Sequence, residues 1–311
     1  MKKCKFTSVA KFRYLLTALL ILTGVTSVYG ADIVLKKDCS FPNITIRGEL
    51  KVGDSQKLDR AFSEIAAYSK NSIECKRSGD KFYNITVSLD SEGGDVDVAL
   101  DMGRIIRREK QAVYVPVKHK CFSACVFLLA AGVQRVPNGD NVGIHRPYFS
   151  ALSNTEDVNV VRAKREAINK KIKAYFDEMD IPQSLLDLML SIPPGEIKIL
   201  SKTELVSFRL SGDDPTHDEM ETAKSAYQYN TTSAEFRKRW GRASANCPSF
   251  ASTSNDLEKF GQRSRCRTAI LLNITERELE KRADKFEAVC KYQYNSKEQM
   301  QCYRDIVTLG K

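Results

Sequence analysis

Helical and strand-like segments alternate along the middle of the chain, and this alternation limits the possible folds more than any other feature of the sequence. The expected helices cover residues 54–70, 95–109 and 123–131, and the expected strands cover residues 83–89, 112–117 and 142–145. Strands that follow one another through helices pair in parallel. The sequence therefore predicts an α/β fold with a mainly parallel sheet built from βαβ units.

Beyond residue 145 the chain becomes more polar and mostly helical. Further helices are expected over 156–180 and 182–190, and Ser201 and Glu204 have the spacing of a capping box that opens another helix. Turn-forming residues gather at 211–215, where the α/β pattern stops. We expect an α/β domain over 31–212 and a small, mostly helical, cysteine-containing domain over 213–311.

The first 30 residues have the composition of a secretory signal peptide. A basic stretch precedes an apolar run over 14–22, and small residues precede Ala31. The pattern predicts cleavage after Gly30 and export to the periplasm or the medium. The alternative is an uncleaved anchor, although the apolar run is short for a hydrocarbon core of roughly 30 Å.

The basic charge of the chain does not by itself indicate a nucleic-acid partner. The formal net charge is +10, but half of this excess comes from lysines and an arginine in the first 13 residues, where no acid stands. The basic helix around 162–173 also carries an apolar stripe and is typical of a solvated face. No phosphate-binding loop of the form Gly-x-x-x-x-Gly-Lys-Ser/Thr is present, so we expect no ATP and no other cofactor.

Eight cysteines remain once Cys4 of the leader is set aside. They are Cys39, Cys75, Cys121, Cys125, Cys247, Cys266, Cys290 and Cys302. An even number in an exported chain predicts disulfides. Closeness in sequence favours Cys39–Cys75, Cys247–Cys266 and Cys290–Cys302, and leaves Cys121 and Cys125 to pair or to stay free. A zinc site from His119, Cys121 and Cys125 lacks a fourth ligand at the usual spacing, so no metal is expected.

Three motifs carry residue types that could perform chemistry. They are Leu-Asp-Ser-Glu-Gly-Gly-Asp-Val at 89–96, Cys-Phe-Ser-Ala-Cys followed by Val-Phe-Leu-Leu-Ala-Ala-Gly at 121–132, and Val-Gly-Ile-His-Arg-Pro at 142–147. Ser123 stands where a strand leads into a helix, and His145 ends the next strand of a parallel sheet, where it can act as a base. The Gly93–Gly94 turn offers amides for an oxyanion. All three meet at the sheet edge where such folds bind ligands.

The order of these motifs resembles the proteolytic subunit of Clp protease over roughly residues 51–210. That family has a Gly-Gly turn, a serine at a helix start leading into Leu-Leu-Ala-Ala-Gly, and Ile-His-Gln-Pro. The resemblance implies the ClpP/crotonase fold, with Ser123 as the nucleophile and His145 as the general base. It also implies that the amides of Gly94 and Ala124 form the oxyanion hole.

The third member of the triad departs from the family pattern. The family has an Asp where this chain reads Pro-Pro-Gly-Glu-Ile at 193–197, and Glu196 fits that position only with a one-residue slip. A glutamate can orient a histidine as an aspartate does. Asp177, Glu178 and Asp180 are further candidates.

Other readings of the same residues stay open. Ser123 could be a helix cap, His119 could be the base, and Lys118 or Lys120 could form a Ser–Lys dyad. Cys121 and Cys125 could be thiol nucleophiles, although their placement on both sides of Ser123 favours a local disulfide.

Two functions follow from these residues. The first is an exported serine peptidase that acts on peptides or proteins, with a homo-oligomer expected because related domains commonly assemble. The alternative is a ClpP-like module without catalysis that binds a protein or peptide in the same cleft.

Overall fold

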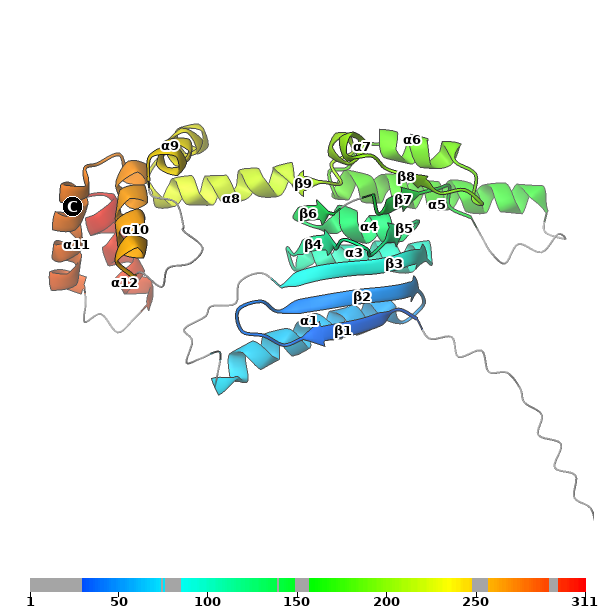
Figure 1. The fold of residues 1–311 in the computed structure, drawn as a ribbon, viewed down its shortest axis with the longest axis horizontal. Helices are drawn as coiled ribbons and strands as arrows, with labels where there is room; N and C mark the ends of the chain where they lie inside the picture. Colours follow the sequence, from blue (N-terminus) through cyan, green and yellow to red (C-terminus); the bar gives the residue numbers. More distant parts are fainter. Residues whose placement is uncertain are drawn as a thin grey trace, which may run out of the picture.

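The chain folds as a mixed α/β structure followed by a helical region. The computed structural model describes residues 30–73, 75, 85–138, 140–148, 157–247, 257–290 and 296–311. The predicted signal peptide therefore lies outside the described residues, apart from Gly30. Figure 1 shows the sheet and its helices on one side and a group of helices on the other, with the yellow helix α8 running between them.

The strands are short, and most of the helices have two to five turns. The strands are β1 (Asp32–Lys36), β2 (Asn43–Leu50), β3 (Thr86–Gly94), β4 (Ala112–Val115), β5 (Cys121–Phe122), β6 (Gln134–Pro137), β7 (Val142–Ile144), β8 (Lys198–Ile199) and β9 (Gly212–Asp213). The helices of the α/β part are α1 (Asp54–Asn71), α3 (Val96–Arg108), α4 (Cys125–Ala131), α5 (Val158–Glu178), α6 (Ser184–Ser191) and α7 (Lys202–Ser207).

The sheet is mostly parallel, as the sequence predicts. The strand order is β8-β7-β5-β3-β4-β6-β9, with β1 and β2 joined to the other edge of β3 through β2. Strand β3 branches, because its first half pairs with β4 while Ser91, nearer its end, pairs with Cys121 of β5. Five strand pairs are parallel, and β1–β2, β6–β9 and β7–β8 are antiparallel. The branch brings the carboxyl ends of β3, β5 and β7 together.

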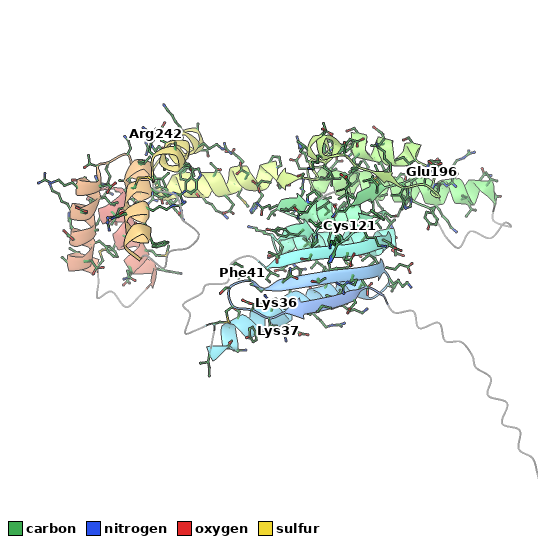
Figure 2. The ribbon with its side chains drawn as sticks, in the orientation of Figure 1. Lys36, Lys37, Phe41, Cys121, Glu196 and Arg242 are labelled. Atoms are coloured by element: carbon green, nitrogen blue, oxygen red, sulfur yellow. A yellow bond between two sulfur atoms is a disulfide. The ribbon has the colours of Figure 1, made fainter. Side chains whose placement is uncertain are left out.

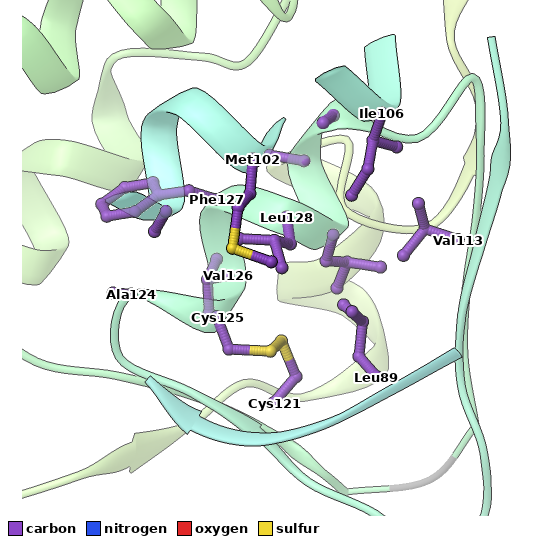
Figure 3. Close-up of a cluster of buried hydrophobic side chains, with 14 of the residues drawn as sticks. Leu89, Met102, Ile106, Val113, Cys121, Ala124, Cys125, Val126, Phe127 and Leu128 are labelled. Carbon is purple, nitrogen blue, oxygen red and sulfur yellow. A yellow bond between two sulfur atoms is a disulfide. The ribbon is translucent and has the colours of Figure 1, made fainter. Parts of the chain in front are cut away.

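The main hydrophobic core surrounds α4, whose seven residues are all buried. Figure 3 shows this helix against Met102 and Ile106 of α3 and Leu89 of β3. The hydroxyl of Tyr175 on α5 donates a hydrogen bond of 2.7 Å to the Phe127 carbonyl, so its polar atom is satisfied inside the core. A helix buried on every face holds its first turn rigidly, and Ser123 lies directly before the cap of this helix.

Two expectations about strands need correction. The strand expected over 112–117 contains Pro116, a residue that favours an edge strand or an irregular ladder, but β4 lies between β3 and β6. The strand ends at Val115, so the proline falls after the ladder and breaks none of its hydrogen bonds. Strands β1 and β2 were not expected at all; every residue of β1 keeps some exposure, which leaves a weak alternation in the sequence.

The described part of the region after β9 consists of helices joined by short turns. It contains α8 (Pro215–Gln228), α9 (Ser233–Asn246), α10 (Leu257–Leu272), α11 (Glu276–Cys290), α12 (Ser296–Tyr303) and the π-helical turn Arg304–Thr308. Small clusters of buried residues hold it together, one of them including Ala269, Leu279 and Ile306. None of the helices in the described ranges has the length and apolar composition that a membrane crossing requires.

The described residues contain the three disulfides that sequence proximity favours and a fourth between Cys121 and Cys125, which proximity leaves to pair or to stay free. They are Cys39–Cys75, Cys121–Cys125, Cys247–Cys266 and Cys290–Cys302, with Cα–Cα distances of 5.1, 5.2, 5.8 and 6.2 Å. Two of them lie in the helical region. Four disulfides fit a chain that reaches an oxidising, extracytoplasmic compartment.

Candidate active site

Ser123 occupies a sharp turn between β5 and α4. Its φ of 55° is in the left-handed region, which a residue with a Cβ rarely adopts. The Ser123 amide donates to the Gly143 carbonyl on β7 at 2.9 Å, and the Ser123 carbonyl accepts from Val126 at 3.1 Å. These bonds hold the strained conformation in place, and the residue is only half-buried. A strained strand-to-helix turn that exposes a serine is the arrangement of a nucleophile elbow.

A disulfide spans this turn. Cys121 and Cys125 are both fully buried and bonded to each other (Figure 3), and Ser123 is midway between them in the sequence. Because both sulfurs are engaged, neither is a thiolate in this form of the protein. The bond links the first residue of β5, the strand before Ser123, to the first residue of α4, the helix after it, which restrains the turn.

His145 follows β7, the strand next to β5. Phe122 pairs in parallel with Gly143, so Ser123 and His145 leave neighbouring strands at the same edge of the sheet. The imidazole is 7% exposed, and its Nδ1 lies 2.9 Å from the Arg146 carbonyl oxygen. A carbonyl can only accept, so this contact assigns the proton to Nδ1 and leaves a lone pair on Nε2. The structure, which describes both residues, contains no hydrogen bond between Ser123 and His145.

Gly93 and Gly94, expected to form a turn after the strand, are the last two residues of β3 and pair with Glu49 and Leu50 beyond a register shift. This irregular strand end, the Gly93–Gly94 turn, packs directly on the serine turn. A Cβ on Gly93 would lie 2.7 Å from the Ser123 Cβ and 2.8 Å from the Ala124 nitrogen, and Gly93 has a φ of 99°. A Cβ on Gly94 would lie 2.6 Å from the Leu50 nitrogen. Both positions therefore need glycine for space as well as for conformation.

The amide of Ala124 is available to a ligand. Among the described residues it donates no hydrogen bond within the chain, as is usual for the first amides of a helix. It lies against Gly93, at the start of α4, where the helix dipole favours negative charge. The Gly93 amide is held by the Ser91 hydroxyl at 3.1 Å, so the turn is preorganised.

Ser91 is a supporting residue that the sequence analysis did not single out. Its side chain is fully buried; its hydroxyl accepts from the Gly93 amide and donates to the Gly48 carbonyl at 2.5 Å. The signal available in the sequence is a serine at an inward position of a strand directly before two glycines. Such a hydroxyl can fix the turn in place of a backbone partner.

The carboxylates proposed as the third triad member do not contact His145. Glu196 is exposed on the loop before β8 (Figure 2), and no hydrogen bond or ion pair in the described structure joins it to the imidazole. Asp177 accepts from Gln183, Glu178 pairs with Arg104, and Asp180 pairs with Arg209. Glu196 therefore stays a prediction, and the observed partner of Nδ1 is a backbone carbonyl.

Of the alternative bases, His119 and Lys120 lie next to acidic side chains and Lys118 is exposed to solvent. His119 lies with its Nδ1 4.0 Å from Asp90 on β3. Lys120 pairs with Glu92, and Lys118 is exposed. Of the basic residues considered, His145 is the one that follows β7, the strand paired with β5.

Apolar side chains line the sheet edge beside these residues. Strand β8 is the last strand of its side of the sheet, and Ile197 and Ile199 are 49% and 39% exposed. A Cβ on Gly143 would touch Ile197 and Phe122, so these side chains gather over the glycine next to the serine turn. An unpaired edge strand with exposed apolar side chains can accept an extended peptide.

Comparison of the chain with models of known protein families gives no match, and comparison with curated proteins gives none. The resemblance to the proteolytic subunit of Clp protease therefore depends on the motif residues and their order, and the family stays a prediction.

Proposed function

We propose that this chain is an exported serine peptidase with a ClpP-like α/β domain. The observation that carries the proposal is the strained, half-buried Ser123 at a strand-to-helix turn, with His145 leaving the adjacent parallel strand. A positive φ at a non-glycine residue costs free energy, and such strain concentrates at functional sites. The exposed edge strand β8 supports a peptide as the substrate.

In the proposed reaction, the Ser123 hydroxyl attacks the amide carbonyl carbon while His145 Nε2 takes its proton. The carbonyl oxygen becomes an oxyanion that accepts hydrogen bonds from the Ala124 amide and the Gly94 amide. The C–N bond then breaks, and the amine leaves with the proton from the imidazole. Water hydrolyses the acyl-serine by the same steps, which restores the Ser123 hydroxyl.

The proton at Nδ1 suits this role. Nδ1 is fixed as a donor by the Arg146 carbonyl, so Nε2 is the nitrogen that can accept the serine proton. The missing hydrogen bond between Ser123 and His145 is compatible with catalysis, because such bonds are often long before substrate binds. A carbonyl stabilises the imidazolium less than a carboxylate does, which favours a slow enzyme.

A fluorophosphonate probe tests the proposal, because it reacts with activated serines and spares ordinary hydroxyls. We expect one label per chain, on Ser123, with loss of labelling in Ser123→Ala. Ser63→Ala is the matched control, because Ser63 is an exposed serine on α1 far from the turn in sequence, and it should label as the wild type does. An unlabelled wild-type protein would contradict the proposal.

The second candidate is a ClpP-like module that binds a peptide without cleaving it. The observation that favours it is the backbone partner of His145 Nδ1 in place of a carboxylate. In this case the probe leaves Ser123 unlabelled, and an extended apolar peptide binds with unchanged mass. The Gly143→Leu change would then abolish binding by displacing Phe122, Ile197 and Ile199, whose side chains already lie at the Cβ position of the glycine.

A further inference from the structure

Ala31, the residue after the expected cleavage point, holds a buried carboxylate by its own nitrogen. Ala31 is 2% exposed, and its N–H donates to Asp54 Oδ2 at 2.7 Å. Asp54 is the first residue of α1, and its side chain is fully buried. A buried carboxylate needs donors or a counter-charge, and two more reach it: the Lys51 amide at 2.8 Å and Lys57 Nζ at 2.7 Å.

Gly30 is pressed against the same carboxylate. A Cβ at this position would lie 2.6 Å from Asp54 Oδ2 and would also collide with Oδ1. In this conformation of the chain, position 30 therefore has no room for a side chain. Gly30 and Ala31 lie at a groove of about 540 Å³ that is also lined by Asp32, Ile33, Leu35, Lys57, Arg60, Ala61 and Glu64.

We propose that the α-ammonium released at Ala31 by the predicted cleavage after Gly30 remains in place as an ion-pair partner of Asp54. A leader peptidase acts before folding, because Ala31 is buried afterwards. Water attacks the Gly30 carbonyl carbon and the C–N bond breaks. Gly30 leaves as a carboxylate, and Ala31 keeps its nitrogen as an ammonium after taking the two protons of the water.

Cleavage strengthens the existing contact without moving the nitrogen. The amide donates one hydrogen bond, whereas the ammonium has three N–H donors and a full charge. Lys57 is 42% exposed and approaches Oδ1, so the two cations take one carboxylate oxygen each. Arg60 and Glu64, which line the groove, are exposed and carry opposite charges.

A short path of hydrogen bonds connects Asp54, the partner of the ammonium, to the Gly93–Gly94 turn of the candidate site. Asp54 Oδ2 also binds the Lys51 amide, and Leu50, the preceding residue, accepts from the Asp95 amide at 2.9 Å. Asp95 follows Gly94 directly. The new N-terminus is thus connected to the Gly93–Gly94 turn through the Asp54 side chain, residues 50–51 and one backbone hydrogen bond. The ion pair is proposed whether or not the chain is a peptidase.

The first measurement is the intact mass of the full chain exported with its own leader. We expect the mass of residues 31–311 with four disulfides, and Ala31 as the first residue. A mature chain that begins at another residue, or one that keeps Met1, overturns the proposal.

The second measurement is the rate at which an amine-reactive acetylating reagent modifies the Ala31 α-amine, followed by peptide mass spectrometry. We expect the native protein to react at least about tenfold more slowly than the chemically unfolded protein, because the reagent reaches the paired amine only after local opening of the fold. Asp54→Asn should abolish most of this protection, and the matched control Glu64→Gln should keep it. Equal rates in the native and unfolded wild-type protein contradict the proposal without reliance on any variant.

Discussion

At the scale of single residues, Ser123 and His145 should act as one unit. Ser123→Ala and His145→Ala should each lower kcat/KM for a peptide by about 1000-fold or more, because removing one partner disables the other. The double variant should be little worse than either single variant. Steady-state kinetics on purified variants measures this, and full activity in Ser123→Ala would exclude the hydrolase.

Glu196→Gln separates two views of the third triad member. The exposed carboxylate has no contact with His145, so we expect kcat/KM to change by less than about threefold, which corresponds to less than 1 kcal/mol. A loss of about 10⁴-fold would instead show that Glu196 moves to the imidazole when substrate binds. Thermal unfolding of the variant, expected to match the wild type, serves as the control.

Gly93→Ala should damage the site more than the fold. The new Cβ would press on Ser123 and Ala124, and the backbone has a φ of 99°. We expect the rate of probe labelling to fall by at least about 100-fold, because the methyl group would displace the Ala124 amide, which is one of the two proposed oxyanion donors. Gly195→Ala is the control, since nothing lies within 4 Å of its Cβ position.

The residues of the candidate site were predictable to different degrees. Ser123, His145 and the glycine turn follow from motif order, because each ends a strand of one parallel sheet. The contact of Asp54 with Ala31 was not predictable, since 23 residues separate the two and neither belongs to a motif. Ser91 was missed because its role is a hydrogen bond to a backbone turn, which leaves no periodicity in the sequence.

At the scale of elements, the two disulfides of the α/β part should differ in what they stabilise. In the chain-entropy view, the loop closed by Cys121–Cys125 contributes about 2 kcal/mol, and the longer Cys39–Cys75 loop contributes about 4 kcal/mol. Replacing Cys121 and Cys125 by alanine should therefore lower the stability less than replacing Cys39 and Cys75. It should lower the rate of probe labelling more. Denaturant unfolding and labelling rates on the two variants measure this, and equal labelling would contradict a role for the bond at the Ser123 turn.

Helix α7 offers a second prediction. Ser201 and Glu204 form the capping box that their spacing predicts, and hydrogen bonds from the Ser201 amide and Lys198 lower the pKa of Glu204 to about 2. A carboxylate with a lowered pKa stabilises the fold at pH values above its ordinary pKa, and this stabilisation is lost as the pH falls toward 2. Glu204→Gln should cost about 1 kcal/mol at neutral pH in denaturant unfolding and much less at pH 2. A cost that does not change with pH would contradict this.

Element prediction succeeded where the pattern was long. The helices at 54–71 and 96–108 lie within a residue or two of the predicted ranges because each repeats its apolar spacing over several turns. Strands β5, β8 and β9 have two residues each, which is too short for any alternation to be recognised. The branch of β3 depends on these short strands, so the arrangement around the site required the three-dimensional structure.

At the scale of the whole molecule, assembly can be tested directly. Val158 and Val160 at the start of α5 are 71% and 47% exposed, which is more apolar surface than a solvated helix end needs. We expect a homo-oligomer in light scattering at micromolar concentration, and conversion toward monomer in Val158→Lys. A monomeric wild type at that concentration would contradict this expectation.

Asp214 joins the helical region to the α/β part. It caps α8 by accepting from the His217 amide, and it is also bonded to Arg135, which is 1% exposed, at 2.8 Å and to Arg107 at 3.1 Å. Burial lowers the pKa of Arg135 to about 10, yet the guanidinium stays charged at neutral pH and needs this carboxylate. Arg135 also donates to the Gly132, Arg209 and Met179 carbonyls, so it connects four segments.

Removing this carboxylate should therefore loosen the molecule as a whole. Burial would raise the pKa of Asp214, but the His217 amide and the two arginines lower it below its ordinary value. The carboxylate then stabilises the fold above about pH 4, and this contribution disappears as pH falls further. Asp214→Asn should cost about 3–5 kcal/mol at pH 7, because it leaves a buried guanidinium without its counter-charge. Denaturant unfolding between pH 2 and pH 7 measures the difference in unfolding free energy between the variant and the wild type. The exposed Asp213→Asn is the control. An Asp214→Asn protein as stable as the wild type at pH 7 would show that the backbone carbonyls alone hold Arg135.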